Sequence, residues 1–318
     1  MQTFLIRRFF YMILSVLAAT VIVFMLSRLA GDPRLLYAKP GGYGITEEQF
    51  EAIGEKLGLD RPLVVQYGLW VGRMLKGDLG RTLLSERPVT RVIGEKIGAT
   101  VQLGLAAWIL ATLIGVPLGV LSAVKRGSSL DYLGRGFALF GQALPNFWLA
   151  IMSVLIFAVA LGWLPSGTRG LQEGFPFAWK NIQYFVLPTA TLAWGAAAGY
   201  LRITRSAMLE VLDSEYVTLA RAKGVSNHRV IWKHAFRNAL IPPLTVSTLL
   251  LTSLLTGAVV IETVFAWPGL GNLAVQAVGN NDFPVLTAVV LLFVIMWVVT
   301  NFLTDIAYAL VDPRIKYG

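Results

Sequence analysis

The side chains that most often do chemistry in proteins are scarce in this sequence. It has no cysteine, which excludes thiol nucleophiles, disulfides and thiolate metal sites. Its two histidines, His228 and His234, are six positions apart, whereas two metal ligands on one helical face are typically four apart. The sequence also lacks the G-x-x-x-x-G-K-[ST] phosphate loop. We therefore expect no metal site, no cofactor and no ATP site of this kind.

Polar side chains within long apolar stretches are the remaining candidates for a functional role. Gln142 and Asn146 are four positions apart and would share a helical face beside Pro145, where a helix break would free backbone groups. A functional role and a structural role are equally compatible with this pair. Glu262 directly follows the apolar stretch 238–261. For this residue, hydrogen bonding between helices or at the end of the stretch is favoured over contact with a ligand. The candidates for a functional role within the apolar stretches, including the lining of a polar path through them, are Gln142, Asn146 and Glu262.

The overall composition indicates a membrane protein. Of 318 residues, 56% are apolar and 14% are charged, and the mean hydropathy is +0.66. A soluble protein carries about 25% charged residues. The net charge of +9 could indicate nucleic-acid binding, but no long basic run accompanies it. We therefore expect the lipid bilayer as a partner and no nucleic acid.

Stretches free of Asp, Glu, Lys and Arg predict the membrane-spanning helices, because a span needs about 20 mostly apolar residues. The third stretch is longer than one span and contains turn-like residues at 163–167, so we expect its helix to end near Leu161. The fold class is therefore an all-α membrane protein with about six transmembrane helices. The predicted spans lie within 9–27, 99–124, 136–168, 181–201, 238–261 and 283–304.

Basic residues predict the orientation of these spans. With both termini in the cytoplasm, the cytoplasmic segments hold fourteen Lys and Arg residues, while the two short outer loops hold only Arg169 and Lys180. Short cytoplasmic loops are enriched in Lys and Arg, whereas long outer segments do not obey this rule. We therefore expect cytoplasmic N- and C-termini.

The long outer segment after the first predicted span has a helical pattern of its own. Thr46 and Gln49 have the spacing of a capping box, and Gly58 is placed to end the helix that follows. A second amphipathic stretch, 62–75, begins with Pro62 at a favourable first helical position. This pattern predicts a small helical element against the outer face of the membrane.

The predicted cytoplasmic stretch 202–237 is too long for a simple turn. Residues 206–223 have a helix-forming composition, Gly224 is a suitable C-terminal residue, and Ser226 can cap a second helix from Asn227. Small residues in this stretch would let another backbone approach closely, and its few charges would fix the orientation of a partner. The stretch is therefore a candidate protein-docking surface.

This stretch resembles the cytoplasmic coupling loop of ABC importer permeases, in the form typical of the dipeptide/oligopeptide branch. The resemblance rests on Tyr216-Val217, on ARAKG at 220–224 and on HAFRNALIP at 234–242. Thr218-Leu219-Ala220 replaces the generic Glu-Ala-Ala start, and Arg237 stands where other branches have proline, as is usual in the peptide branch. Further matching segments are 7–8, 28–33, 57–62, 77–80, 144–149, 262–265, 268–271 and 312–314.

The resemblance implies a type I ABC importer permease fold in the cytoplasmic (inner) membrane of a bacterium or archaeon. It divides the chain into a first transmembrane helix (1–30), an extracytoplasmic helical segment (31–98) and a five-helix core (99–318) with the coupling loop at 202–237. The implied partners are a second, similar permease subunit, two ABC ATPase subunits or domains that use ATP, and an extracytoplasmic solute-binding protein. The implied ATPase-coupling residues are Glu215, Tyr216, Ala220, Arg221, Ala222, Lys223 and Gly224.

The implied function is non-catalytic: passage of di- or oligopeptides through a pathway formed with the second permease subunit. Another solute of the same branch, such as a nickel complex, glutathione or an oligosaccharide, stays open because the solute-binding protein does most of the selecting. An ion-coupled secondary transporter should show ion-coupling carboxylates or two repeated halves, and no internal repeat is found. An intramembrane hydrolase would need a serine–histidine or paired-aspartate site within the spans, and neither histidine lies in one.

Overall fold

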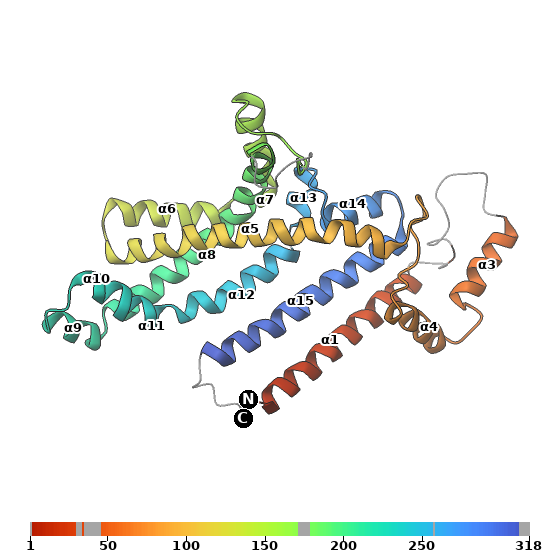
Figure 1. Cartoon of the computed structure of the whole chain (residues 1–318), viewed down its shortest axis with the longest axis horizontal. Coiled ribbons are helices and arrows are strands. Elements are labelled where there is room, and N and C mark those ends of the chain that lie inside the picture. The colour runs from red at the N-terminus through yellow and green to blue at the C-terminus, as the bar shows by residue number, and fades with distance from the viewer. Residues whose placement is uncertain (1, 30–33, 35–45, 171–178, 257, 312–318) are drawn as a thin grey trace. The chain divides into compact units, whose positions relative to one another are not determined.

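The structure is a computed structural model that describes all residues except 1, 30–33, 35–45, 171–178, 257 and 312–318 (Figure 1). The described residues form helices and no β-strand. Their contacts divide the chain into two compact units. Unit 1 comprises 1–100 and 268–302, and unit 2 comprises 101–267 and 303–318.

Four helices in the described part of the chain are long and apolar enough to cross a membrane, and a fifth span is added if one bent helix pair counts as one. The prediction of an all-α membrane protein is thus confirmed. The count of six and the side on which the termini lie stay predictions. The expected span 181–201 lies within a longer helix, α8 (Trp179–Leu212), which is not among the four. The four spans are Ile6–Leu29, Val89–Val124, Ile241–Val264 and Phe283–Ile306.

Unit 1 begins with the long helix α1 (Gln2–Leu29), against which α4 (Leu63–Leu75) packs. The hydroxyls of Thr20 and Tyr67 are 2.7 Å apart, and the Phe24 ring lies 5.5 Å from the ring of Tyr67 and 5.6 Å from that of Trp70. These aromatic contacts bury part of the apolar face of α4, which explains why this stretch folds as a helix rather than remaining a solvated linker.

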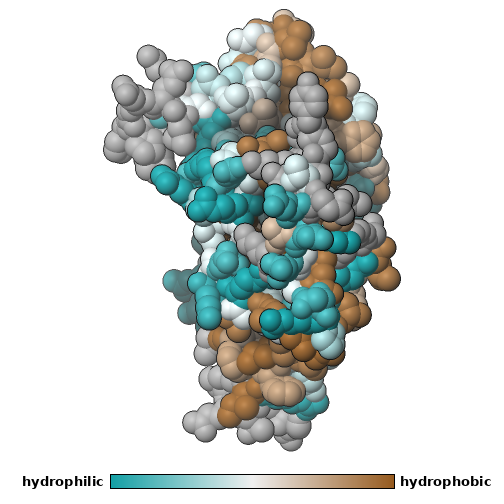
Figure 2. All heavy atoms as spheres, turned by 90° about the vertical axis from the view of Figure 1, so that its right-hand side faces the viewer, coloured by the Kyte–Doolittle hydropathy of each residue, from teal (hydrophilic) through white to brown (hydrophobic). Residues whose placement is uncertain are grey.

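The predicted helical pattern after the first span is confirmed. Helix α3 (Glu47–Leu57) ends at Gly58, whose φ of 66° is the left-handed conformation that glycine adopts most easily. Pro62 immediately precedes α4 rather than occupying its first position. Hydrophilic side chains gather across the middle of the face that carries α3 and α4 (Figure 2).

The rest of unit 1 is built from the start of α5 (Val89–Val124), α14 (Leu270–Gly279) and most of α15 (Phe283–Val311). Val89, Leu270 and Val289 are fully buried members of one apolar cluster that joins the three helices. The hydroxyl of Thr100 accepts a 2.7 Å hydrogen bond from the backbone N–H of Leu270 at the start of α14. Helix α14 is not predicted by the sequence pattern.

In unit 2, close packing of α5 against α8 depends on two glycines. A Cβ on Gly115 would collide with the carbonyl oxygen of Ala197, and a Cβ on Gly119 would lie 2.7 Å from Cβ of Thr204. Small residues of this kind let two membrane helices approach closely, where van der Waals contact and hydrogen bonds take over from the hydrophobic effect. Side chains larger than glycine at these two positions would therefore push α5 and α8 apart.

Residues 136–168 do not form one continuous helix. Helix α6 (Ser129–Ala143) and α7 (Asn146–Ser153), which continues as the π-helix η1 (Val154–Ala160), meet at an angle of 104°. Leu144 is extended, as expected for a residue before proline, and Pro145 immediately precedes the new helix. The predicted helix end near Leu161 is confirmed, since η1 ends at Ala160.

Candidate functional site

The predicted cytoplasmic stretch starts as a direct extension of α8 and then breaks. Helix α8 ends at Leu212, and a separate helix, α9, spans Glu215–Ala222. Ser214 is extended between them, and its hydroxyl donates to the carbonyl oxygen of Val211, 2.5 Å away. The expectation of one continuous helix over 206–223 is therefore wrong, because a serine side chain that bonds to the preceding turn competes with the helical ladder.

Beyond this break, the predicted helix–turn–helix is confirmed. Lys223 caps α9, and Gly224 has a φ of 74°. Ser226 then precedes α10 (Asn227–Arg229), although its side chain makes no capping hydrogen bond. The second helical arm continues without interruption as the π-helix η2 (Val230–Phe236) and α11 (Arg237–Ala239), and it leads into α12 (Ile241–Thr256).

A buried apolar cluster fixes α9 to the rest of unit 2. Val217 of α9 is fully buried in it, together with Met208 of α8, Val230 and Ala235 of η2, and Val120 of α5. One face of a two-turn helix is thereby anchored to three other helices. Buried apolar contact therefore ties α9 to α5, α8 and η2.

The opposite face of α9 is exposed. The side chains of Tyr216 and Leu219 are 43% and 54% exposed. They lie in a groove of about 640 Å³ that α9 forms with the end of α8. The groove is lined by Asp213, Glu215, Tyr216, Thr218, Leu219 and Ala222.

Three of the seven predicted coupling residues, Glu215, Tyr216 and Ala222, line this groove. Six are exposed, and Ala220 is half-buried against the apolar cluster. The sequence reasoning missed Asp213, Thr218 and Leu219, which line the same groove. For Leu219 a pattern was available, because positions 215, 219 and 222 follow the spacing of one helical face. The six exposed residues are Glu215, Tyr216, Arg221, Ala222, Lys223 and Gly224.

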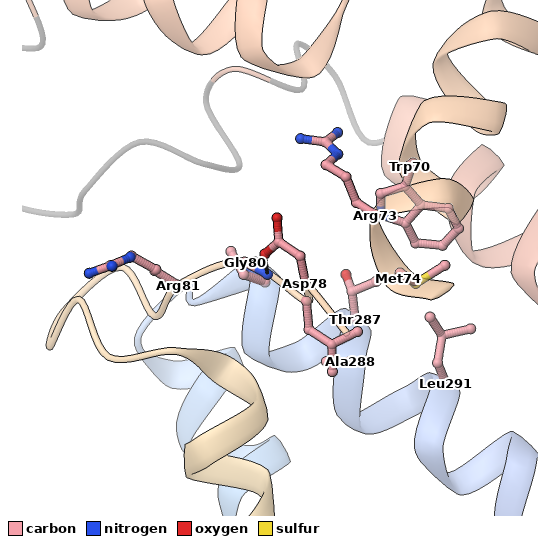
Figure 3. Close-up of a pocket in the computed structure, with 11 residues that line it drawn as sticks. Trp70, Arg73, Met74, Asp78, Gly80, Arg81, Thr287, Ala288 and Leu291 are labelled. Carbon is pink, nitrogen blue, oxygen red and sulfur yellow. Dashed lines mark hydrogen bonds between the residues drawn. The ribbon is translucent and has the colours of Figure 1, made fainter. Parts of the chain in front are cut away.

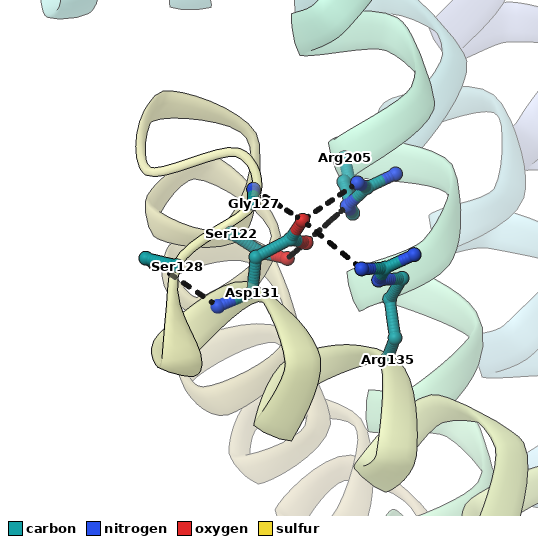
Figure 4. Close-up of polar contacts among 6 residues, drawn as sticks. All are labelled: Ser122, Gly127, Ser128, Asp131, Arg135 and Arg205. Atoms are coloured by element: carbon teal, nitrogen blue, oxygen red, sulfur yellow. Dashed lines mark hydrogen bonds and ion pairs between the residues drawn. The ribbon is translucent and has the colours of Figure 1, made fainter.

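A buried ionic network lies about two turns before the end of α8 (Figure 4). Asp131, near the start of α6, is 1% exposed. Its Oδ1 accepts hydrogen bonds from Oγ of Ser122 at 2.6 Å and from Nε of Arg205 at 2.7 Å. Its Oδ2 accepts from the backbone N–H of Gly127 at 3.0 Å and from Nη2 of Arg205 at 3.1 Å. Arg135 adds an ion pair at 3.6 Å.

This network joins the turn between α5 and α6 to α8. Four hydrogen bonds satisfy both oxygens of the buried carboxylate, which is the condition under which a buried charge is tolerated. Arg205 and Asp131 are 74 positions apart, and no local pattern connects them. Sequence reasoning therefore missed both. Through Asp131, the side chain of Arg205 on α8 is linked to the backbone of Gly127 in the α5–α6 turn.

Comparison with known families identifies the chain. Residues 115–317 match the family described as binding-protein-dependent transport system inner membrane component, and residues 1–103 match the N-terminal region of such membrane components. The chain belongs to this family. The permease is 40% identical, over the full length of both chains, to the oligopeptide transport system permease protein AppB of Bacillus subtilis. It is 37% identical, again over both full lengths, to the dipeptide transport system permease protein DppB of Alkalihalophilus pseudofirmus.

Solved structures support the same fold. The permease is similar to a chain of the inward-facing MetNI methionine ABC transporter, with a TM-score of 0.57 and 21% sequence identity. The similarity covers 70% of the permease and 96% of that chain. A membrane permease fold of this kind agrees with the several apolar helices described above.

The candidate pathway residues of the permease lie on three different helices, α6, α7 and α13. Gln142 is exposed on α6 and accepts a 2.8 Å hydrogen bond from Nη1 of Arg202, while Asn146 begins α7. Because α6 and α7 meet at 104°, the expectation that Gln142 and Asn146 share one helical face is wrong. Glu262 is fully buried in α13 (Val259–Val264). Contact of these residues with a transported solute stays a prediction.

Proposed function

We propose that this permease is a subunit of an ATP-driven importer of di- or oligopeptides and forms the translocation pathway with a second, similar permease subunit. The full-length identity to relatives named for oligopeptide and dipeptide transport supports this substrate class. An extracytoplasmic solute-binding protein and two ABC ATPase subunits or domains complete the complex in the cytoplasmic membrane of a bacterium or archaeon. The permease itself is non-catalytic, needs no cofactor, and leaves ATP hydrolysis to its partners.

The main observation behind the proposed mechanism is that one face of α9 is buried and the other is exposed. Val217 anchors one face in the buried cluster, and Tyr216 and Leu219 are exposed on the groove. In the proposed mechanism the ATPase subunit docks on the groove and pushes α9 when ATP closes the ATPase dimer. The anchored helices then move together, and the pathway alternates between inward and outward access.

The deciding experiment is ATP hydrolysis by the complex reconstituted with its co-encoded solute-binding protein. Saturating short peptides are compared with oligosaccharides, nickel chelates and glutathione. Stimulation by peptides alone is the expected result. Stimulation by one of the other solutes would replace the substrate and leave the architecture standing. Uptake that follows an ion gradient and is insensitive to ATP would overturn the ATP-driven mechanism.

A further inference from the structure

Unit 1 contains a cavity that the proposed transport mechanism does not use. It has a volume of about 200 Å³ and lies where the end of α4, the loop at 78–81 and the first turns of α15 meet (Figure 3). Trp70 and Arg73 of α4, Asp78 of the loop, and Thr287 and Leu291 of α15 line it. Drug-sized ligands fill pockets of about 300–1,000 Å³, so this cavity suits a small polar group rather than a whole oligopeptide.

Thr287 is the residue that points to a ligand. It is 8% exposed, and its hydroxyl oxygen is covered by the protein and has no hydrogen-bond partner. In Figure 3 this oxygen points from α15 toward the side chains of Asp78 and Met74. Elsewhere in the same helix, the hydroxyl of Thr300 donates to the carbonyl of Met296 at 2.7 Å. Buried hydroxyls are nearly always hydrogen-bonded, so an orphaned one in a cavity wall indicates a missing partner.

The charges on the cavity wall specify the chemistry of that partner. Arg73 offers a guanidinium, which suits a phosphate or carboxylate, and Asp78 offers a carboxylate, which suits an ammonium group. Oδ1 of Asp78 accepts from the backbone N–H of Gly80 at 3.0 Å, which fixes the side chain and leaves it further acceptor capacity. A ligand with both an anionic and an ammonium group fits this pair.

The position of the cavity relative to the membrane span favours a lipid. The span of α15 begins at Phe283, so the cavity lies at one end of it, where the hydrocarbon core meets water. Thr287 and Leu291 are four positions apart on one face of α15, and both line the cavity. The wall of the cavity therefore changes from a hydroxyl to an apolar side chain along α15, toward the middle of the span. Helix α4 exposes Val64 and Leu75, at 82% and 83%, as an interfacial helix would, and Trp is enriched at this depth.

We propose that this cavity binds the headgroup of a zwitterionic phospholipid that carries a primary ammonium. The phosphate lies at Arg73 and the hydroxyl of Thr287, the ammonium lies at Asp78, and an acyl chain follows α15 past Leu291. A soluble phosphate or a headgroup without acyl chains has the same polar chemistry. The experiment must therefore separate a lipid from these soluble anions and zwitterions.

The test uses the whole purified complex after delipidation in detergent, and it measures binding by native mass spectrometry and by the shift of the thermal unfolding midpoint. The probes are phosphatidylethanolamine, phosphatidylcholine, phosphatidylglycerol, glycerophosphoethanolamine and inorganic phosphate. Phosphatidylethanolamine should bind most tightly, because phosphatidylcholine lacks an ammonium N–H and phosphatidylglycerol lacks the ammonium. Equal binding of glycerophosphoethanolamine or phosphate would overturn the lipid assignment.

Two variants test the residues themselves. Thr287→Val should weaken phosphatidylethanolamine binding about tenfold, the effect of one charge-assisted hydrogen bond. Without lipid, this variant should be as stable as the wild type, because the deleted hydroxyl has no partner there. Asp78→Asn, at an exposed position that keeps the Oδ1 acceptor, should abolish the preference over phosphatidylcholine. Thr300→Val is the matched control and should bind like the wild type. Wild-type affinity in Thr287→Val together with unchanged preference in Asp78→Asn would refute the site.

Discussion

Nε of Arg205 on α8 lies 2.7 Å from Oδ1 of Asp131 on α6, and both side chains are largely or fully buried. Removing one partner of such a pair leaves an uncompensated buried charge, at a cost of about 3–5 kcal/mol. We expect Asp131→Asn to lower the thermal unfolding midpoint of the purified complex strongly and to reduce the coupling of ATP hydrolysis to uptake.

Arg135 provides the control for this prediction. Its Nη2 lies 3.6 Å from the same carboxylate, but its side chain is 45% exposed. Exposed ion pairs contribute about 0–1 kcal/mol, so Arg135→Gln should change the midpoint little. Equal destabilisation by Asp131→Asn and Arg135→Gln would show that the contact with Arg205 has no special weight.

The turn after α9 provides a second prediction. Gly224 has a φ of 74°, and a Cβ there would meet no atom within 4 Å, so only backbone strain opposes a side chain. The left-handed conformation costs about 1–2 kcal/mol in a residue with a Cβ. Gly224→Leu should relieve this strain by shifting α9 against α10. Membrane insertion should stay normal, and solute uptake per ATP hydrolysed should fall.

A second glycine serves as a control that distinguishes the effect of backbone strain in general from the effect of strain next to α9. Gly162, after η1, has a φ of 63° and equally open surroundings, so Gly162→Leu introduces the same kind of strain away from α9. Uptake and ATP hydrolysis are measured in vesicles for both variants. Normal coupling in Gly224→Leu, or equal uncoupling in Gly162→Leu, would contradict a role of this turn in coupling.

The two faces of α9 should respond differently to truncation. Leu219→Ala removes apolar surface from the groove, so it should weaken co-purification of the ATPase subunits while leaving the thermal stability of the isolated permease unchanged. Val217→Ala leaves a cavity in the buried cluster, so it should lower the thermal stability of the isolated permease itself, unlike Leu219→Ala. The reverse assignment of effects would place the docking surface elsewhere.

Asp282 predicts a pH dependence of stability. Burial raises the pKa of its carboxyl above the usual value, although hydrogen bonds from the backbone N–H groups of Leu83 and Val285 partly offset this. Between the usual value of about 3.9 and the raised pKa, the folded chain binds more protons than the unfolded chain. The stability contribution of Asp282 is therefore complete below that window and is lost as the pH rises through it.

Asp282→Asn removes the ionisation and keeps an acceptor for the start of α15. The thermal unfolding midpoint of wild type and variant is measured at several pH values above and below the window. We expect the variant to lose part of the decline with rising pH. Its single amide oxygen can accept from only one of the N–H groups of Leu83 and Val285, so a loss of stability that does not depend on pH is expected as well. Parallel curves for the two proteins would show that Asp282 is not responsible.

The sequence predicted the elements whose patterns are local. Gly58 and Gly224 end helices where they were expected to. Helices often end at a residue in the left-handed conformation, and because this residue is usually glycine, the end can be recognised in the sequence. The helix–turn–helix of the predicted cytoplasmic stretch and the short helices after the first span follow from the same kind of local pattern. The exposed residues Glu215, Tyr216, Arg221 and Ala222 of α9 were named by the resemblance to the coupling loop of importer permeases.

Features that depend on tertiary structure escaped prediction. The contact of Arg205 with Asp131 joins residues 74 positions apart, and the cavity near Thr287 forms only where α4, a loop and α15 meet. The break at Ser214 depends on one side-chain hydrogen bond that competes with the helix. The 104° bend after Leu144 changes which polar residues share a face, although Pro145 was visible in the sequence.

That bend also constrains how the chain can be made. Each arm, Ser129–Ala143 and Asn146–Ala160, is about 22 Å long at α-helical rise, shorter than a hydrocarbon core of about 30 Å. During synthesis, neither arm can therefore settle across the bilayer by itself. Both arms contact α8, which is synthesised later. Until α8 is synthesised, both short arms lack the helix against which they pack in the folded chain. We therefore expect this stage of membrane insertion to depend most on the cell's insertion machinery.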